Sequence, residues 1–156
     1  MAIFEGAPRI TPFLWFNNNA EEAVEFYLSI FRNSRRLSEL RNDGNAPGPR
    51  GSILTIAFEL DGQRFTALNG GPVYTINEAV SFVVRCDNQE EVDYYWDRLT
   101  SGGTEIQCGW LKDKFGVTWQ VVPSKLPELI RNSKAMKAMM GMKKINLAEL
   151  ERAAKE

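Results

Sequence analysis

Histidine is absent from all 156 residues of the chain. Histidine is the usual general base near neutral pH and the commonest metal ligand. Its absence therefore excludes Ser-His-Asp and Cys-His nucleophile schemes and every His-based metal site. Any chemistry would have to use carboxylates, Tyr, Lys, Cys or bound water.

Cysteine is scarce, with only Cys86 and Cys108 in the sequence. Two cysteines are too few for a disulfide framework, and their separation excludes a CxxC zinc or redox motif. Reduced thiols packed in the core are the favoured interpretation. The alternative is a nucleophilic Cys108 whose pKa is lowered by Lys112 or Lys114, but no base or acid accompanies it.

Long charge blocks of one sign and long apolar runs are also missing. Nineteen Lys and Arg face twenty Asp and Glu, a formal net charge of -1, which argues against a nucleic-acid partner. No segment approaches the roughly 20 apolar residues that span a membrane, and the N-terminus lacks a signal-peptide pattern. We expect one cytoplasmic domain that contacts neither membrane nor nucleic acid.

An internal repeat organises the chain. The segments "NAEEAVEFY" at 19–27 and "NQEEVDYYW" at 88–96 share an Asn-x-Glu-Glu start, and apolar residues recur in both at helical spacing. Asn19 and Asn88 are the expected N-caps, with Glu22 and Glu91 three positions later as in a capping box. A repeat at about half the chain length predicts two similar modules.

Strand candidates surround both predicted helices. Runs at 12–16 and 81–86 precede the helices, and further candidates follow them at 35–40, 52–60 and 63–69 and, in shorter form, within 104–122. Asp61-Gly62 and the stretch "KDKFG" at 112–116 predict hairpin turns, and the Gly- and Pro-rich segment 41–51 predicts a mobile loop. The pattern predicts an α+β fold of two βαβββ modules, about 9–70 and 79–123, within residues 1–123.

The remaining residues, 124–156, differ in kind. They hold four of the five methionines, all between Met136 and Met142. We expect a helical C-terminal extension of two short helices with a break around Gly141 and a capped start at Asn146. Methionine at helical spacing favours a core or subunit contact over a cofactor site.

Several ordered motifs carry a family resemblance: "PFLWFNNNAEEAVEFYLSIF", "FTALNGGP", "EAVSFVVRC", "QEEVDYYWDRL" and "CGWLKDKFGVTWQVVP". They are similar to the vicinal oxygen chelate superfamily, which includes glyoxalase I, ring-cleaving dioxygenases and bleomycin- and fosfomycin-resistance proteins. They resemble above all its PhnB-like branch, often labelled 3-demethylubiquinone-9 3-methyltransferase. The resemblance covers about residues 9–123. It implies the glyoxalase/bleomycin resistance-like fold, a homodimer and a cleft that often holds a divalent metal.

The same resemblance places the metal-ligand positions of the superfamily at or near Thr11, Ser81 and Gln120, with Asn69 near the remaining one. Hydroxyls and amides are weak neutral ligands, whereas divalent transition metals in such clefts prefer imidazole or carboxylate. We therefore expect no metal and no cofactor. Methyl transfer from S-adenosylmethionine usually needs a glycine-rich turn between a strand and a helix, and "LNGGP" at 68–72 predicts only a turn.

A small-molecule cleft is the expected functional site. Strand alternation places Thr11, Phe13 and Trp15 on one face, so the cleft would have aromatic walls and a neutral, hydrogen-bonding floor. Such a site suits a flat, uncharged or cationic organic molecule. The alternatives are that the aromatic side chains fill a closed core and that Gln120 ties down a neighbouring strand. The predicted ligand-binding residues are Thr11, Phe13, Trp15, Asn69, Ser81 and Gln120.

The sequence favours a metal-free small-molecule-binding protein whose ligand is unknown. The alternative is an enzyme of unknown reaction, nominally a 3-demethylubiquinone-9 3-methyltransferase. Candidate bases such as Glu59, Asp113 and the tyrosines form no convincing catalytic pair.

Overall fold

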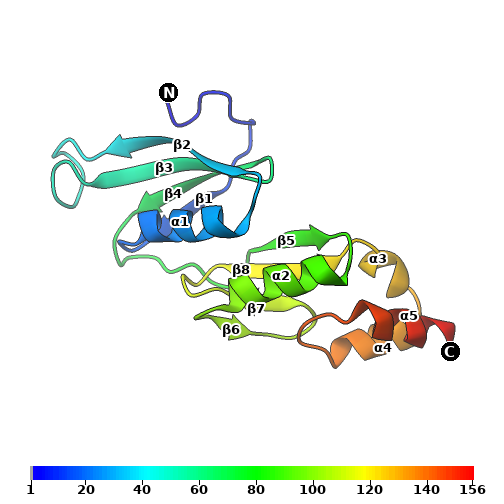
Figure 1. Ribbon diagram of the computed structural model, residues 1–156. Coiled ribbons are helices and arrows are strands. Elements are labelled where there is room, and N and C mark those ends of the chain that lie inside the picture. Colours follow the sequence, from blue (N-terminus) through cyan, green and yellow to red (C-terminus); the bar gives the residue numbers. More distant parts are fainter. Residues whose placement is uncertain (1) are drawn as a thin grey trace. The chain divides into compact units, whose positions relative to one another are not determined.

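The computed structural model describes residues 2–156, which divide into two compact units on either side of the boundary between Ile76 and Asn77. Each unit holds a four-stranded mixed sheet with one helix packed on it, and the second unit continues into the C-terminal helices (Figure 1). The predicted α+β fold of two βαβββ modules with a helical extension is therefore confirmed. Within the described part of the chain, no helix is long and apolar enough to cross a membrane.

The first unit contains β1 (Phe13–Phe16), α1 (Ala20–Ile30), β2 (Ser34–Arg41), β3 (Ile53–Leu60) and β4 (Gln63–Asn69). The strand order is β1-β4-β3-β2, in which β1 runs parallel to β4 and the other pairs are antiparallel. The predicted hairpin turn joins β3 to β4, and both of its central residues, Asp61 and Gly62, adopt positive φ angles. Such angles suit the twist of a tight hairpin.

The helix α1 covers one face of this sheet. Tyr27 of α1 is fully buried and stacks on Phe58 of β3, which in turn stacks on Phe65 of β4, with ring centroids 6.4 and 5.4 Å apart. Because side chains alternate along a strand, the strand residues next to those that face α1 point to the other side of the sheet. That helix-free face carries Phe13, which is 49% exposed, and the half-buried Trp15.

The second unit repeats this plan with shorter strands: β5 (Ser81–Cys86), α2 (Gln89–Thr100), β6 (Thr104–Glu105), β7 (Trp110–Lys112) and β8 (Thr118–Pro123). The order β5-β8-β7-β6, with β5 parallel to β8, matches that of the first unit. The three buried positions of α2 correspond at one constant offset to three of the five buried positions of α1. The pairs are Ala23 and Val92, Tyr27 and Trp96, and Ile30 and Leu99, while α1 also buries Ala20 and Val24.

The two helices begin differently. Asn88 accepts a hydrogen bond from the Glu91 backbone N–H at 2.9 Å, which confirms it as the N-cap of α2. The Glu91 carboxylate accepts the backbone N–H of Asp87, one residue before the position that a capping box requires. Asn19 holds the N-cap position of α1 as predicted, but its side chain makes no capping hydrogen bond. Asn69, from the end of β4, accepts the Ala20 N–H at 2.9 Å instead.

The C-terminal extension forms three helices, α3 (Leu126–Leu129), α4 (Ser133–Met140) and α5 (Leu147–Lys155), rather than the predicted two. Gly141 ends α4 as expected, and Asn146 caps α5 by accepting the Glu149 N–H at 3.1 Å. The extension has its own apolar core, which includes strand residue Val122. Its buried members are Val122, Leu126, Met139, Met142, Ile145 and Leu150.

Asp113 organises the turn between β7 and β8. The side chain is 3% exposed, and its Oδ1 accepts hydrogen bonds from the backbone N–H groups of Phe115 and Val117 at 2.8 and 3.0 Å. Its Oδ2 accepts a third from Trp119 Nε1 at 2.9 Å. Gly116 supplies the predicted left-handed position, with φ 90°. These contacts give Asp113, one of the candidate bases, a structural role in the turn.

We expect Asp113→Ala to lower the free energy of unfolding by about 3 kcal/mol, because it leaves several donors in and beside the turn without an acceptor. Urea denaturation followed by tryptophan fluorescence measures the change. Asp97→Ala is the matched control, since Asp97 is an exposed aspartate of α2. Equal stability of the two variants would contradict this role.

Candidate functional site

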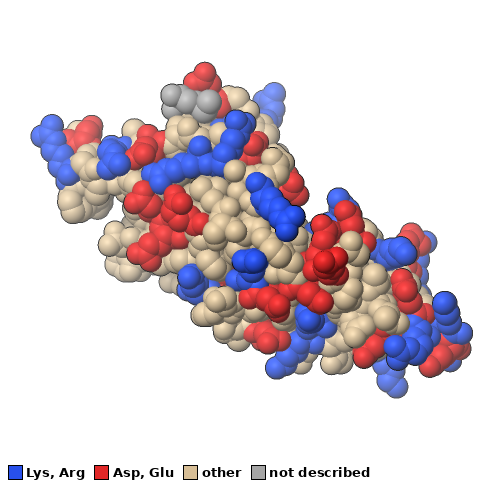
Figure 2. Space-filling model, viewed as in Figure 1, with Lys and Arg blue, Asp and Glu red and all other residues tan. Residues whose placement is uncertain are grey.

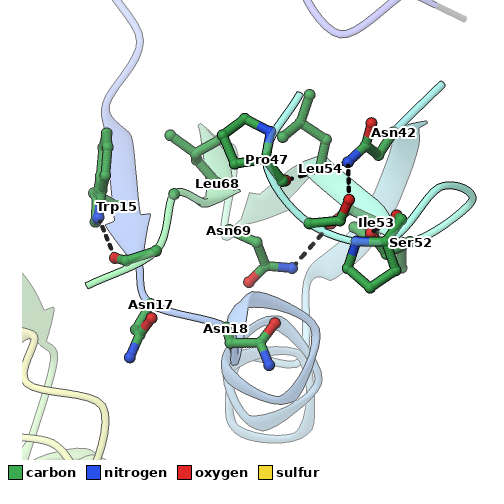
Figure 3. Close-up of a pocket in the computed structure, with 14 residues that line it drawn as sticks. Trp15, Asn17, Asn18, Asn42, Pro47, Ser52, Ile53, Leu54, Leu68 and Asn69 are labelled. Carbon is green, nitrogen blue, oxygen red and sulfur yellow. Dashed lines mark hydrogen bonds between the residues drawn. The ribbon is translucent and has the colours of Figure 1, made fainter. Parts of the chain in front are cut away.

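A pocket of about 590 Å³ lies at one end of the sheet in the first unit (Figure 3). Three parts of the chain enclose it: the ends of β1 and β4 with the glycines that follow, the segment entering α1, and the loop between β2 and β3. Leu54 and Leu68 contribute apolar surface, and Asn17, Asn18 and Asn69 contribute amides. None of the described residues that line the pocket is charged. The lining therefore suits an uncharged, largely apolar body with a few hydrogen-bonding groups.

Trp15 forms one wall of this pocket and is held firmly. Its indole N–H donates to the carbonyl of Gly71 at 2.9 Å, and Tyr74 meets its ring edge-on with centroids 5.0 Å apart. Gly70 passes so close that a Cβ there would lie 2.4 Å from the indole, which requires glycine at this position. The indole is thus fixed before any ligand arrives.

Asn69 ties the pocket's base together. Its Oδ1 accepts the Ala20 N–H at 2.9 Å. Its Nδ2 donates to the carbonyl of Ile53 at 3.1 Å (Figure 3). One side chain on β4 thus joins the start of α1 to the start of β3. Both ends of the amide are engaged by backbone groups, so Asn69 shapes the pocket.

The loop between β2 and β3 forms the wall facing Trp15 in Figure 3 and is organised around Asn42. This side chain is 3% exposed, and its Nδ2 lies 3.0, 3.2 and 3.1 Å from the carbonyl oxygens of Ala46, Pro47 and Gly48. Its Oδ1 accepts the Gly44 N–H at 2.8 Å. Sequence reasoning predicted only a mobile loop here. The structure gives this segment an internal hydrogen-bonded scaffold.

The second unit places Ser81 and Gln120 side by side on the helix-free face of its sheet. Gln120 Nε2 donates to Ser81 Oγ at 2.9 Å and so links β8 to β5. Trp110 lies opposite Gln120 in the strand register and is half-buried. This contact fits the interpretation in which Gln120 ties down a neighbouring strand, while its partly exposed amide keeps further hydrogen-bonding capacity.

The predicted site residues thus fall into two groups. Trp15 and Asn69 line one pocket in the first unit, and Ser81 and Gln120 are hydrogen-bonded to each other in the second. Thr11 donates its hydroxyl hydrogen to the carbonyl of Pro8 at 3.2 Å. A cleft that combines all of the predicted residues stays a prediction.

The donor set at the superfamily's metal-ligand positions does not fit a tightly bound divalent metal. Thr11, Asn69, Ser81 and Gln120 offer only neutral oxygen and nitrogen atoms, and each side chain is already hydrogen-bonded within its unit. Among residues 2–156, no three His, Cys, Asp or Glu side chains lie together where they could hold a metal ion.

The second unit fills its counterpart of the pocket. The Gly70 N–H donates to the carbonyl of Phe16 at the end of β1, and the Ser124 N–H donates to the carbonyl of Cys86 at the end of β5, both at 2.8 Å. Gly70 and Ser124 are therefore equivalent positions. Two residues earlier, Leu68 at the pocket corresponds to Val122. Val122 is covered by the apolar core of the C-terminal extension. The Gln89 side chain fastens the extension by donating to the Ile145 carbonyl at 2.9 Å and accepting from the Leu147 N–H at 2.8 Å.

Sequence reasoning missed the rim and loop residues of the pocket. Asn17 and Asn18 are exposed, and their side chains have no hydrogen-bond partner among the described residues. The available signals were the three consecutive asparagines before α1 and an asparagine near the start of the Gly- and Pro-rich segment 41–51. The sequence contains no signal for the long-range contacts of Asn69 or for the close approach of Gly70 to Trp15.

The two cysteines differ in accessibility. Burial raises the pKa of the Cys86 thiol to about 12, and the nearby carboxylates of Glu91 and Asp87 act in the same direction. Cys108 is half-buried, and its Sγ lies 3.7 Å from Met140 Sδ. Cys86 is therefore a protonated core thiol at neutral pH, as the sequence predicted for both cysteines.

The fold and its relatives place the chain in a class and then in a family. Two βαβββ modules define the glyoxalase/bleomycin resistance-like fold of the vicinal oxygen chelate superfamily. The sequence pattern of 3-demethylubiquinone-9 3-methyltransferase matches residues 8–122, and the chain belongs to that family, the PhnB-like branch.

Solved structures share the fold. The PhnB protein of Bacillus cereus is 35% identical, with a TM-score of 0.68 and 74% of this chain and 99% of that chain covered. Protein PA1353 from Pseudomonas aeruginosa is 23% identical, with a TM-score of 0.61 and coverage of 74% and 97%. The fosfomycin resistance protein FosX from Listeria monocytogenes, solved with Mn(II) and sulfate, is 15% identical, with a TM-score of 0.54 and coverage of 80% and 97%. The comparison with functionally curated proteins gives no match.

We expect Asn42→Asp to destabilise the loop by about 2 kcal/mol, because a carboxylate oxygen would replace the Nδ2 group that faces three carbonyl oxygens. Hydrogen exchange of the Gly44 and Ala46 amides measures the change. Asn33→Asp, the same change at an exposed asparagine outside this loop, is the control. Unchanged exchange in Asn42→Asp would refute the scaffold.

We expect the native protein to react rapidly with 5,5′-dithiobis(2-nitrobenzoic acid) through Cys108 alone, since Cys86 is fully buried and protonated. Absorbance at neutral pH counts the thiols before and after denaturation. Cys108→Ser should abolish the rapid reaction. Two rapidly reacting thiols in the native protein would contradict the assignment.

Proposed function

We propose that this protein binds a small organic molecule in the pocket of its first unit without the help of a metal ion. The observation that carries the proposal is the rigid aromatic wall. Trp15 is fixed by Gly71 and Gly70 beside an uncharged pocket of about 590 Å³. A flat, uncharged ring system would stack on or against the indole, while a polar substituent would reach the free amides of Asn17 and Asn18.

The metal-free part of the proposal rests on the chemistry of the donor set. The hydroxyl and amide side chains already form hydrogen bonds with one another or with the backbone. To coordinate a metal ion they would have to break these bonds, and as neutral ligands they would bind the ion only weakly. That Thr11, Phe13, Ser81 and Gln120 also bind a ligand stays a prediction from the sequence.

A homodimer and a cytoplasmic location also belong to the proposal. Apolar side chains on the helix-free faces support the dimer, since Phe13 is 49% and Val83 59% exposed. Methyl transfer is not part of it. Neither sheet of the described residues is the doubly wound parallel sheet on which most methyltransferases hold S-adenosylmethionine.

We expect the uncharged, flat dye N-phenyl-1-naphthylamine to bind the protein with a rise in fluorescence that EDTA does not abolish. Trp15→Ala should weaken this binding about tenfold, because the ring loses its aromatic wall. Fluorescence titration measures both. Phe4→Ala, which removes an exposed aromatic side chain of the same unit outside the pocket, is the control.

Two results would overturn the proposal. The first is equal dye affinity of Trp15→Ala, Phe4→Ala and the unaltered protein, which would place binding elsewhere. The second is binding that disappears with EDTA and returns with Mn²⁺, which would restore the metal. Circular dichroism of each variant ensures that lost affinity is not lost folding.

A further inference from the structure

A second, charged hollow lies next to the neutral pocket. This hollow, of about 360 Å³, shares the lining residues Asn18, Ser52, Ile53 and Asn69 with the pocket, so the two are immediate neighbours. It is further lined by the first turn of α1 and by the end of β2. A ligand seated against Trp15 could therefore extend past Asn69 into a region of different chemistry.

The charged groups in this hollow are unequally engaged. Arg41 is bound twice, with Nη1 2.9 Å from the Gly51 carbonyl and Nη2 2.8 Å from the Glu39 carboxylate. The Glu21 carboxylate pairs with Arg36 at 2.9 Å. Glu22 is exposed and has neither an ion pair nor a side-chain hydrogen bond with any described residue. The one charge of this hollow without a partner among the described residues is therefore negative; we call the hollow the mouth of the pocket.

The start of α1 does not reverse this sign. A helix N-terminus favours anions through its free N–H groups, but the Ala20 N–H is already taken by Asn69 Oδ1 at 2.9 Å. Two carboxylates occupy the first turn. Figure 2 shows acidic side chains gathered over α1. These carboxylates would repel an anionic ligand group, whereas Glu22 would attract a cationic one.

We propose that the ligand of this pocket is an amphiphilic amine, with a flat uncharged body against Trp15 and a protonated amino group at Glu22. The inference rests on the proposed function and adds the ligand's charge and orientation. The uncharged lining offers an ammonium group no ion-pair partner inside the pocket, and a buried charge without such a partner is costly. The free carboxylate at the mouth provides that partner without displacing an existing ion pair.

Three dansyl probes with the same aromatic body and a five-carbon chain test the inference. One chain ends in an ammonium group (dansylcadaverine), one in a methyl group (N-pentyl dansylamide) and one in a carboxylate (N-dansyl-6-aminohexanoate). We expect the ammonium probe to bind about fivefold more tightly than the methyl probe, as an exposed ion pair allows. The carboxylate probe should bind the most weakly.

Substitution of the carboxylate assigns the effect to one residue. Glu22→Gln should abolish the preference for the ammonium probe and leave the methyl probe's affinity unchanged. Glu90→Gln makes the same charge change in the first turn of α2 and should leave the preference intact. Fluorescence titration at low and high salt measures the affinities, and the ammonium preference should shrink as salt screens the pair.

The outcomes separate this inference from the proposed function. If the methyl probe binds through Trp15 but the ammonium group adds nothing, or if Glu22→Gln keeps the preference, the amine assignment is wrong and the pocket stands. Tighter binding of the carboxylate probe would also overturn the assignment. If none of the probes responds to Trp15→Ala, the proposed function itself fails.

Discussion

The side chain of Asn69 is the contact on which the first unit's pocket depends. It accepts the first free N–H of α1 and donates to the carbonyl at the start of β3, so helix, sheet and pocket wall are fixed by one amide. Removing a polar group from water is costly unless it finds hydrogen-bond partners in the protein. Here backbone groups provide a partner for both the oxygen and the nitrogen of the Asn69 amide. The glycines that follow then bring the chain directly over Trp15.

The two units show how one architecture reaches two different results. In the first, a loop scaffolded by Asn42 stands apart from Trp15 and leaves a pocket. In the second, the corresponding loop is short, and the C-terminal extension packs Met142 and Ile145 over the equivalent position, Val122. The duplicated modules therefore share their sheet order and helix packing but differ in what lies at the end of the sheet.

The fold could be predicted because its signals are local. Repeated helix stripes, the Asp61-Gly62 turn and alternating strands each depend on residues a few positions apart. The site could be predicted only in part. Two of the predicted residues, Trp15 and Asn69, line the pocket. The partner of Asn69 lies 49 residues away in the sequence, and no local pattern reveals that Asn69 takes over the capping bond expected of Asn19. Tertiary contacts decided these features.

The most direct test of the account is an NMR titration of the ¹⁵N-labelled protein with 1-naphthylmethylamine, a flat amine, in the presence of EDTA. The account predicts that the indole N–H signal of Trp15 and the side-chain amide signals of Asn17 and Asn18 shift together and saturably. The signals of Trp96 and Trp119 in the core of the second unit should stay in place. Shifts that spare Trp15, or that require Mn²⁺, would contradict a metal-free pocket in the first unit.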